Sequence, residues 1–318
     1  MNYLTPATDH ERKIFYEEEY NHKEIPDYIT NSIADREFAF DSYGKGPRDR
    51  YNVFHDTKNL GRILYYKKPF AVYSSVALYQ RPQKREGWKG AELVFDVDAK
   101  DIPIRTCDCG DGEICPFCLS QAKEIMLGIY DVLCDLGLKD IHMVYSGRGY
   151  HLRCLDEEVL VADMKVRREI LNYCLGAVSP EFGKDALLQH FAVNFAYPRT
   201  FTDWLMYTVA NMEEERKYAG LNTRDKKQLM NIKEHILRQE WAQARNNVKP
   251  KKYDTLIKQI AKINSTLTDT KVTIDVQRIL RLPSTLHTKV SMKCVDIKNI
   301  ETFNPLRDAL PKYVEERK

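Results

Sequence analysis

Short segments in which apolar and polar residues alternate recur along the chain, and a period of two residues is typical of β-strands. Residues 92–98 place apolar side chains on one face and acidic side chains on the other. Residues 70–79 are apolar and rich in Val, Tyr and Ser, which predicts another strand. Residues 141–145 and 151–155 predict two short strands joined by a glycine-rich turn. A last alternating segment, residues 272–276, predicts a strand late in the chain.

Apolar residues that recur every three to four positions predict helices between these strands. This spacing is found in residues 8–30, 119–136 and 157–178. From about 206 to 265 the apolar residues follow helical spacing alone, with a break at Pro250.

Strands are expected on both sides of this last helical block, which indicates an insertion into a larger fold. We therefore expect a mixed-sheet α/β (α+β) core formed by residues 1–205 and 266–318. Residues 206–265 would form a small helical subdomain inserted into it.

The composition of the 318 residues adds limits on size and location. With 43% hydrophobic residues the chain has enough apolar surface for one large domain or two modest ones. No stretch approaches the roughly 20 apolar residues of a membrane-spanning helix, and the first residues lack the pattern of a signal peptide. We therefore expect a cytoplasmic, nucleoid-associated protein, whose eight cysteines serve a purpose other than structural disulfides.

The net charge of +3 hides an uneven distribution of charged residues. Residues 1–44 have four Lys/Arg and ten Asp/Glu, whereas residues 45–89 have eleven Lys/Arg and three Asp/Glu. Residues 206–265 are again basic, with thirteen Lys/Arg and seven Asp/Glu. Such zones suit a polyanionic partner or nucleotide phosphates, although solvated charged faces give the same pattern.

The first candidate for chemistry is the acidic pair Asp96 and Asp98. Side chains alternate across a strand, so both carboxylates point to the same face. Their mutual repulsion is relieved when a divalent cation such as Mg²⁺ binds between them, and two such ions can support a displacement at phosphorus. The simpler alternative is a strand edge with two solvated aspartates. Asp275, on the polar face of the segment 272–276, is a third candidate if the two strands are neighbours.

A second candidate is the turn between the strands at 141–145 and 151–155. Gly147 and Gly149 allow positive φ and close approach of the backbone to a ligand. Ser146, Arg148 and His151 could then donate to phosphate oxygens. An ordinary hairpin with an exposed arginine is the alternative.

A basic loop follows Asp275 closely, which favours phosphate binding over an ordinary basic surface loop. Its candidate donors are Arg281, Ser284, His287 and Lys289, on a loop fixed by Pro283.

Four cysteines lie within twelve residues, at positions 107, 109, 115 and 118. Cys107, Cys109, Cys115 and Cys118 together can close a tetrahedral structural Zn²⁺ site. A redox pair at Cys115 and Cys118, or an iron–sulfur cluster, is an alternative. Zinc is favoured in a cytosolic protein.

The order of these motifs resembles the catalytic small subunit of archaeal and eukaryotic DNA primase. The motifs are REFAF at 36–40, AVYS at 71–74, ELVFDVD at 92–98, the four cysteines, SGRGYH at 146–151, Asp275 and His287. The resemblance covers most of residues 10–295 and is weakest in the helical block.

The resemblance implies a catalytic role for Asp96, Asp98 and Asp275, which would hold two Mg²⁺ or Mn²⁺ ions. It also implies nucleotide-binding residues in the glycine-rich turn, the C-terminal loop and the upstream basic region. These residues are Ser146, Arg148, His151, Arg281, His287, Arg50, and Lys67 or Lys68, between which the alignment is ambiguous by one position.

The resemblance further implies an RRM-like α/β core joined to a second α/β unit, with a zinc motif at 107–118. Many archaeal members are said to include His among the zinc ligands, whereas all four candidates here are Cys. The family's activity is primer synthesis from NTPs or dNTPs on single-stranded DNA. Its partner is a large subunit with an iron–sulfur domain, which together with the small subunit forms a heterodimer.

Three other functions fit parts of the sequence. A metal-dependent nuclease would use the same aspartates, but it has no need for a triphosphate-binding set. A non-catalytic zinc-containing nucleic-acid-binding protein would leave the aspartates without a role. A stand-alone primase-polymerase of the same superfamily would differ by lacking a partner subunit.

Overall fold

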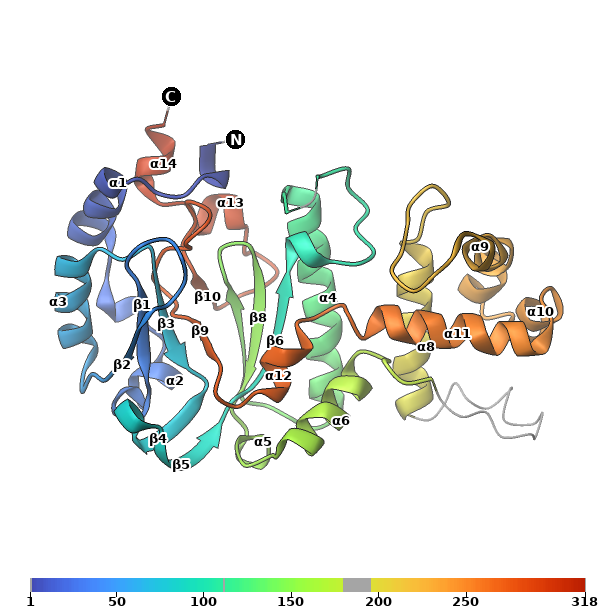
Figure 1. Cartoon of the computed structure of the whole chain (residues 1–318), viewed down its shortest axis with the longest axis horizontal. Helices are drawn as coiled ribbons and strands as arrows, with labels where there is room; N and C mark the ends of the chain where they lie inside the picture. Colours follow the sequence, from blue (N-terminus) through green and yellow to red (C-terminus); the bar gives the residue numbers. More distant parts are fainter. Residues whose placement is uncertain (1, 111, 180–195, 318) are drawn as a thin grey trace.

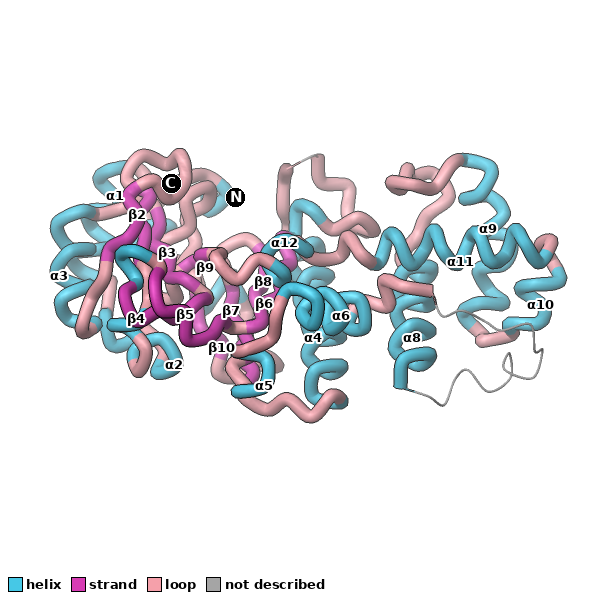
Figure 2. Tube along the Cα trace, turned by 60° about the horizontal axis from the view of Figure 1, so that its bottom comes forward, coloured by secondary structure: helices cyan, strands magenta, loops and turns pink. Residues whose placement is uncertain are grey.

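The computed structural model describes residues 2–110, 112–179 and 196–317. Two four-stranded antiparallel sheets lie next to each other, and a block of helices extends from one end of the molecule (Figure 1). Figure 2 shows that all strands belong to one half of this elongated shape. The mixed α/β fold class expected from the sequence is confirmed.

The first sheet has the strand order β2-β1-β3-β9. Its strands are β1 (Phe38–Asp41), β2 (Asp49–Asn52), β3 (Ala71–Ser75) and β9 (Ile279–Arg281). The buried Phe38 and Phe40 belong to the same core cluster as Leu60 and Leu64 of helix α3 (Thr57–Lys67). In Figure 1, α3 lies at the outer side of this sheet, away from the second sheet.

The second sheet has the order β10-β7-β8-β6. Its strands are β6 (Leu93–Asp98), β7 (Ile141–Tyr145), β8 (Gly149–Cys154) and β10 (Val295–Ile297). Helix α4 (Pro116–Asp135) packs on β6 and β8, where its apolar residues share a core with Leu93, Phe95 and Val97. One face of β6 is thereby fixed in the core, and the aspartates of this strand lie on the other.

A hairpin, β4 (Ala77–Arg81) and β5 (Glu86–Ala91), connects the two sheets. It contributes to a small second core, in which Val94 of β6 packs with Val272 and with Leu280 of β9. This core therefore contains residues from strands of both sheets.

The other helices surround the sheets or form the helical block. They are α1 (Asp9–Ile14), α2 (Asp27–Thr30), α5 (Glu157–Leu160), α6 (Met164–Cys174), α8 (Ala196–Ala210), α9 (Thr223–Leu237), α10 (Trp241–Asn246), α11 (Pro250–Asn264), α12 (Thr270–Ile274), α13 (Pro305–Asp308) and α14 (Lys312–Glu315). Helices α8 to α11 form the block at the far end of the molecule, as Figure 2 shows. In the described ranges, no helix combines the length and the apolar character needed to span a bilayer.

Most of the expected elements are present. The strands expected at 92–98, 141–145 and 151–155 correspond to β6, β7 and β8. The strand expected at 70–79 is divided at Val76, whose N–H donates to the carbonyl of Arg278 at 3.0 Å where the chain passes from the first sheet to the hairpin. The expected helix at 119–136 begins three residues earlier, as α4.

The strand expected at 272–276 is wrong, because residues 272–274 belong to helix α12 and residues 275–276 follow its end without forming a strand. Val272 and Val276 each lie two positions from Ile274, as in a strand, but they lie four positions from each other. Residues four positions apart share one face of a helix, so the same spacing also fits a helix. Asp269 starts the helix, since its carboxylate accepts a hydrogen bond from the N–H of Lys271 at 3.0 Å.

Candidate active site

The acidic pair lies on the face of β6 opposite its core-facing residues. Asp96 and Asp98 have side chains 24% and 25% exposed, whereas Phe95 and Val97 are at most 1% exposed. This alternation is what the sequence pattern predicts. The two carboxylates lie on the same face of β6 as Val94, which belongs to the small second core.

Strand β8 places the glycine-rich turn directly beside these carboxylates. In the antiparallel register, Asp96 lies opposite His151 and Asp98 lies opposite Gly149. His151 Nε2 is 3.4 Å from Asp96 Oδ1, and Arg148 Nη2 donates to Asp98 Oδ2 at 2.6 Å. The carboxylates and the proposed phosphate donors therefore share one face of two paired strands.

Burial and nearby cations act in opposite directions on the two carboxylates. Burial raises the pKa of Asp96, but His151 and the arginines Arg281 and Arg148 outweigh it, so the pKa is lowered overall. For Asp98 burial is the larger effect, and its pKa is raised despite the hydrogen bond from Arg148. The strand pair thus holds one carboxylate whose pKa is lowered and one whose pKa is raised.

The two glycines of the turn are required for different steric reasons. Gly147 has φ +101°, and a Cβ there would lie 2.6 Å from Cβ of His287. Gly149 lies so close to β6 that a Cβ would be 2.0 Å from the carbonyl oxygen of Val97. Both positions exclude a side chain, so the turn packs tightly against β6 and the His287 loop.

The C-terminal loop brings two more donors to the same turn. Arg281 donates to the carbonyl of Ser146 at 3.1 Å and to the hydroxyl of Tyr73 at 3.3 Å. His287 is 5% exposed, and its pKa is far below the ordinary value because of burial and the nearby Arg281 and Arg148. The N–H of Lys289 donates to His287 Nδ1 at 3.0 Å, so the neutral ring carries its proton on Nε2.

Several polar atoms around the turn are buried without a hydrogen bond in the described part of the chain. They are Arg148 Nε, Arg281 Nε and His151 Nδ1. Buried guanidinium N–H groups without a partner are costly, so the two arginine atoms indicate an anionic ligand such as a phosphate.

Asp275, the third candidate, lies at the C-terminal end of α12, and its role at the metals stays a prediction. Asp275 ends α12, where its carboxylate accepts from the N–H of Gln277 and lies 3.5 Å from Arg278. At the other end of α12, the N–H of Asp269 donates to the carbonyl of Asp96 at 2.9 Å. Asp269 is exposed, and its carboxylate accepts the N–H of Lys271 at the start of α12.

Asp269 was not expected from the sequence. A helix-capping aspartate before Thr-Lys-Val was its only local signal, and its hydrogen bond to β6 joins residues far apart in the chain. Asp269 and Asp275 are about 9 Å apart along α12, given the usual rise per residue of a helix.

The upstream basic residues occupy the first sheet and α3. Arg50 donates to the buried Glu37 at 2.7 Å. Lys67 pairs with Asp49 at 2.6 Å. Lys68 pairs with Glu17 at 3.0 Å. All three cations thus have carboxylate partners, and the structure does not bring Lys67 or Lys68 to the turn; their role in nucleotide binding stays a prediction.

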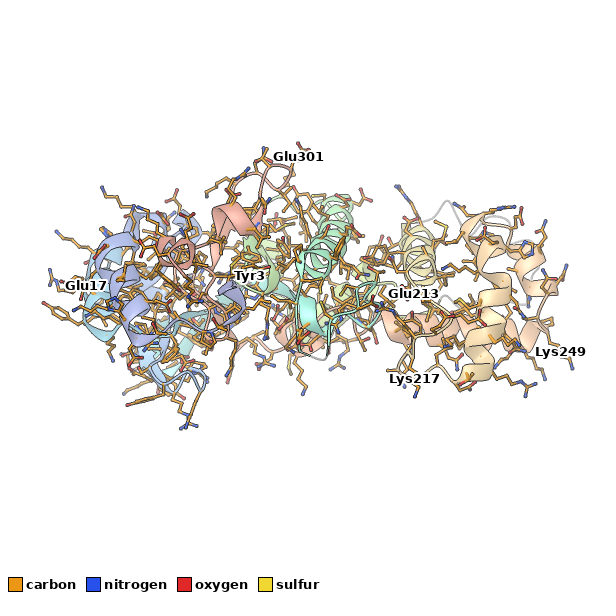
Figure 3. All side chains as sticks on the ribbon, turned by 90° about the horizontal axis from the view of Figure 1, so that it is seen from above. Tyr3, Glu17, Glu213, Lys217, Lys249 and Glu301 are labelled. Carbon is orange, nitrogen blue, oxygen red and sulfur yellow. The ribbon has the colours of Figure 1, made fainter. Side chains whose placement is uncertain are left out.

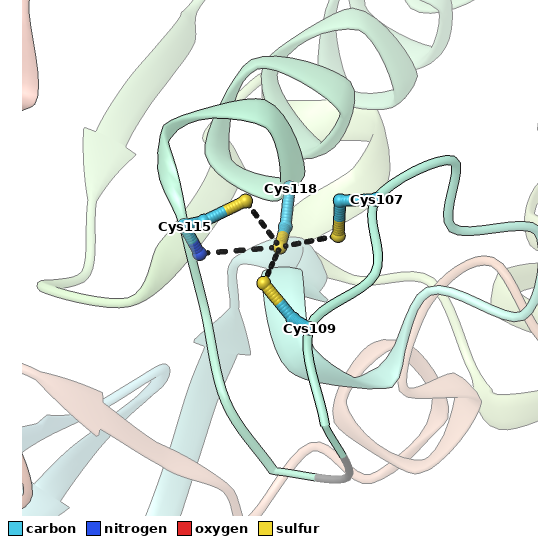
Figure 4. A group of neighbouring side chains, drawn as sticks. All are labelled: Cys107, Cys109, Cys115 and Cys118. Atoms are coloured by element: carbon cyan, nitrogen blue, oxygen red, sulfur yellow. Dashed lines mark hydrogen bonds between the residues drawn. The ribbon is translucent and has the colours of Figure 1, made fainter.

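The four cysteines come together at the start of α4 (Figure 4). Cys118 Sγ lies 3.1 Å from Cys107 Sγ, 3.5 Å from Cys115 Sγ and 3.7 Å from Cys109 Sγ. A tetrahedral Zn²⁺ site with Zn–S bonds of about 2.3 Å has sulfurs about 3.8 Å apart, so the four thiols fit a metal ion. In the described residues this is the only cluster of three or more such ligand atoms within 4.8 Å of one another.

The loop between α8 and α9 holds the cysteine loop from outside. Arg216 donates to the carbonyls of Arg105 and Cys107 at 2.6 and 2.8 Å and to Asp108 at 3.0 Å. Figure 3 shows its neighbours Glu213 and Lys217 where the helical block meets the rest of the chain. The helical block and the cysteine cluster are therefore directly connected.

Comparison with known proteins gives this site a family. Residues 95–298 match the family model of the DNA primase small subunit. The DNA primase small subunit of Methanothermobacter thermautotrophicus is 46% identical over 323 positions, covering 100% of this chain and 99% of that protein. Those of Methanobrevibacter smithii and Pyrococcus furiosus are 45% and 38% identical, covering 99% and 98% of this chain and 99% and 94% of those proteins.

These matches define the chain as a nucleotidyltransferase of the DNA-directed RNA polymerase type. It belongs to the DNA primase small subunit family, as the order of its motifs predicts.

Proposed function

We propose that the chain synthesises primers on single-stranded DNA, from NTPs or dNTPs, as the catalytic subunit of a replicative primase. The observation that carries this proposal is the pairing of β6 with β8, which places Asp96 opposite His151 and Asp98 opposite Gly149. Metal-binding carboxylates and phosphate donors are thereby presented on one face. A nuclease that used the same carboxylates would gain nothing from this donor set.

Two Mg²⁺ or Mn²⁺ ions at Asp96 and Asp98 would neutralise the triphosphate and lower the pKa of the attacking 3′-hydroxyl. The chain's own donors would orient the phosphates. His287 would donate from Nε2, and Arg281, already fixed by Ser146, would offer its unpartnered Nε. Arg148 neutralises Asp98 in this structure and could donate to a phosphate oxygen instead. Positioning and charge neutralisation would supply most of the rate enhancement.

A third carboxylate at the metals would come from Asp275, as the resemblance implies, with Asp269 as the alternative. The backbone of Asp269 is hydrogen-bonded to the strand residue that carries the first carboxylate. Asp275 is held at the far end of α12 by Gln277 and Arg278.

We extend the proposal to the architecture and to the partners. Residues 1–205 and 266–318 would form the catalytic core, with an RRM-like unit and a structural zinc at 107–118, and residues 206–265 a helical subdomain. The relatives are named small subunits, which supports a large partner subunit, with an iron–sulfur domain, in a heterodimer. The place of action would be the cytoplasm, at the nucleoid.

The test is primer synthesis by the purified chain on unprimed single-stranded DNA, with labelled ribo- and deoxyribonucleotides and Mg²⁺ or Mn²⁺. We expect template-dependent product from the wild type and none from folded Asp96→Ala/Asp98→Ala. Activity in that double variant would refute the metal assignment. Absence of product from the wild type, also after addition of the large subunit, would refute the function.

The third carboxylate is tested in the same assay by a matched pair of variants. Asp275→Asn should lower the rate of nucleotide addition by about 100-fold or more, because a negative charge beside the metals is lost. Asp269→Asn should retain most of the activity. The opposite ranking would assign the role to Asp269.

A further inference from the structure

The solvent-facing side of α3 combines aromatic and basic residues in an unusual way. Tyr65 and Tyr66 are 45% and 70% exposed, and their rings meet edge to face at 5.5 Å. Arg62 and Lys58 are exposed one and two turns earlier on the same helix. The sequence of α3, TKNLGRILYYK, contains no Asp or Glu. Its apolar face, formed by Leu60 and Leu64, is already buried, so the tyrosines do not serve the core.

The loop 42–48 extends this surface with the same kinds of side chain. Tyr43 is 75% exposed, Lys45 and Arg48 are exposed, and the loop SYGKGPR has no acidic residue. Asp41 holds the loop in place, because its carboxylate accepts hydrogen bonds from the N–H groups of Tyr43, Lys45 and Gly46 at 3.1 to 3.2 Å. These hydrogen bonds therefore fix the loop that carries the exposed ring of Tyr43.

Loop 42–48 connects α3 with the candidate active site. On one side, Gly44 packs against Phe70, which follows the end of α3, and Lys67 of α3 pairs with Asp49 just after the loop. On the other side, Lys289 Nζ donates to the carbonyl of Gly44 at 3.3 Å. Lys289 is two residues from His287, so the surface is continuous from the proposed phosphate donors to α3.

The charge of this surface is available for binding. In the described ranges, Lys45, Arg48, Lys58 and Arg62 form no ion pair, in contrast to Lys67. Exposed rings interleaved with unpaired cations are what proteins use to bind single strands, because bases stack on the rings and phosphates follow the cations.

Resting on the proposed function, we propose that loop 42–48 and the exposed face of α3 form a binding surface for the single-stranded template. The strand would leave the active site past Lys289 and stack its bases on Tyr43, Tyr65 and Tyr66. A duplex has no unstacked bases to offer, so this surface favours single strands.

The test measures binding of fluorescein-labelled oligo(dT) to the full chain by fluorescence anisotropy at several salt concentrations. Tyr43→Ala/Tyr65→Ala/Tyr66→Ala should weaken binding by roughly tenfold or more, with an unchanged salt dependence. Lys58→Gln/Arg62→Gln should reduce the slope of log K against log salt by about 0.7 for each phosphate that no longer binds a cation.

The matched control is Tyr130→Ala/Lys139→Gln, which removes an exposed ring and an exposed cation at α4 and the loop after it. We expect it to bind like the wild type. If the triple tyrosine variant bound single strands as tightly as the control does, the proposal would be overturned. This is also the result expected if the tyrosines bind a protein partner instead of DNA. An equal loss for blunt duplex DNA would also overturn it.

Nucleotide addition to a pre-annealed primer, at saturating DNA, separates the two proposals. The triple tyrosine variant should add nucleotides at the wild-type rate, because its carboxylates and phosphate donors are unchanged. A wild type that bound oligo(dT) through the tyrosines but made no product would refute the proposed function alone.

Discussion

Glu92, the residue before β6, forms the most deeply buried ion cluster in the part of the chain that is described. Arg36 Nη2 and Arg153 Nε each lie 2.6 Å from one of its carboxylate oxygens, and all three side chains are 0% exposed. Burial raises the pKa of Glu92, but Arg153 and Arg36 outweigh it and lower the pKa overall. The ionised carboxylate therefore stabilises the fold.

The substitution Glu92→Gln keeps the size of this side chain and removes its charge. Two guanidinium groups would then be buried with a single neutral acceptor between them. Loss of one partner of a buried ion pair costs about 3–5 kcal/mol, a large part of the 5–15 kcal/mol that is typical for folded proteins. We expect a decrease of this size in the free energy of unfolding at pH 7.

The assay is urea unfolding, followed by far-UV circular dichroism and tryptophan fluorescence. The wild-type contribution of Glu92 should be complete above its ordinary pKa near 4.5 and be lost as the pH falls through its lower folded value. The control is Glu86→Gln, whose pair with Arg81 is exposed (47% and 62%) and worth at most about 1 kcal/mol. A Glu92→Gln variant as stable as this control would refute the reasoning.

Three shorter predictions concern the turn, the cysteine loop and the chain ends. Gly149→Ala should destabilise the fold by about 3 kcal/mol or more, because its Cβ would overlap a carbonyl of β6; a wild-type urea midpoint would contradict this. Arg216→Ala should release zinc to a colorimetric chelator faster than its neighbour Lys217→Ala, since Arg216 binds two carbonyls of the cysteine loop; equal release rates would exclude that role. Arg317 lowers the pKa of Glu11 to about 2. The variant Glu11→Gln should therefore lose less stability than the wild type as the pH falls from 4.5 to 2. An acid unfolding curve equal to that of the wild type would count against this ion pair.

Local patterns were sufficient for the half of the site that β6 and β8 build. Alternation along residues 92–98 correctly placed Asp96 and Asp98 on one face, and the two glycines marked the turn between β7 and β8. These features depend on neighbours within a few residues, which a sequence shows directly. The clustering of the four cysteines could be predicted for the same reason, because they lie within twelve residues of the sequence.

Features that depend on long-range contacts could not be predicted. Three alternating apolar residues fit both a strand and one turn of helix, so the spacing alone does not distinguish them, and Val272 packs with Val94 from the helix. The hydrogen bond from Asp269 to Asp96 and the pairing of Lys67 with Asp49 have no local signal. A basic segment shows that cations are present, but not which of them are already neutralised.

The pKa values of the acidic pair indicate that the site is a compromise between stability and function. Burial raises the pKa of Asp98, so the folded chain disfavours the ionised carboxylate that a metal ion requires. The neutral, isosteric Asp98→Asn should therefore unfold at the same or a slightly higher urea concentration than the wild type in EDTA, while primer synthesis is lost. Glu92→Gln and Gly149→Ala should instead lose activity and stability together, because they act through the pairing of β6 with β8 that places the aspartates. If Asp98→Asn were strongly destabilised, the side chain of Asp98 would be needed for the stability of the fold. The loss of activity in this variant would then no longer identify a metal ligand.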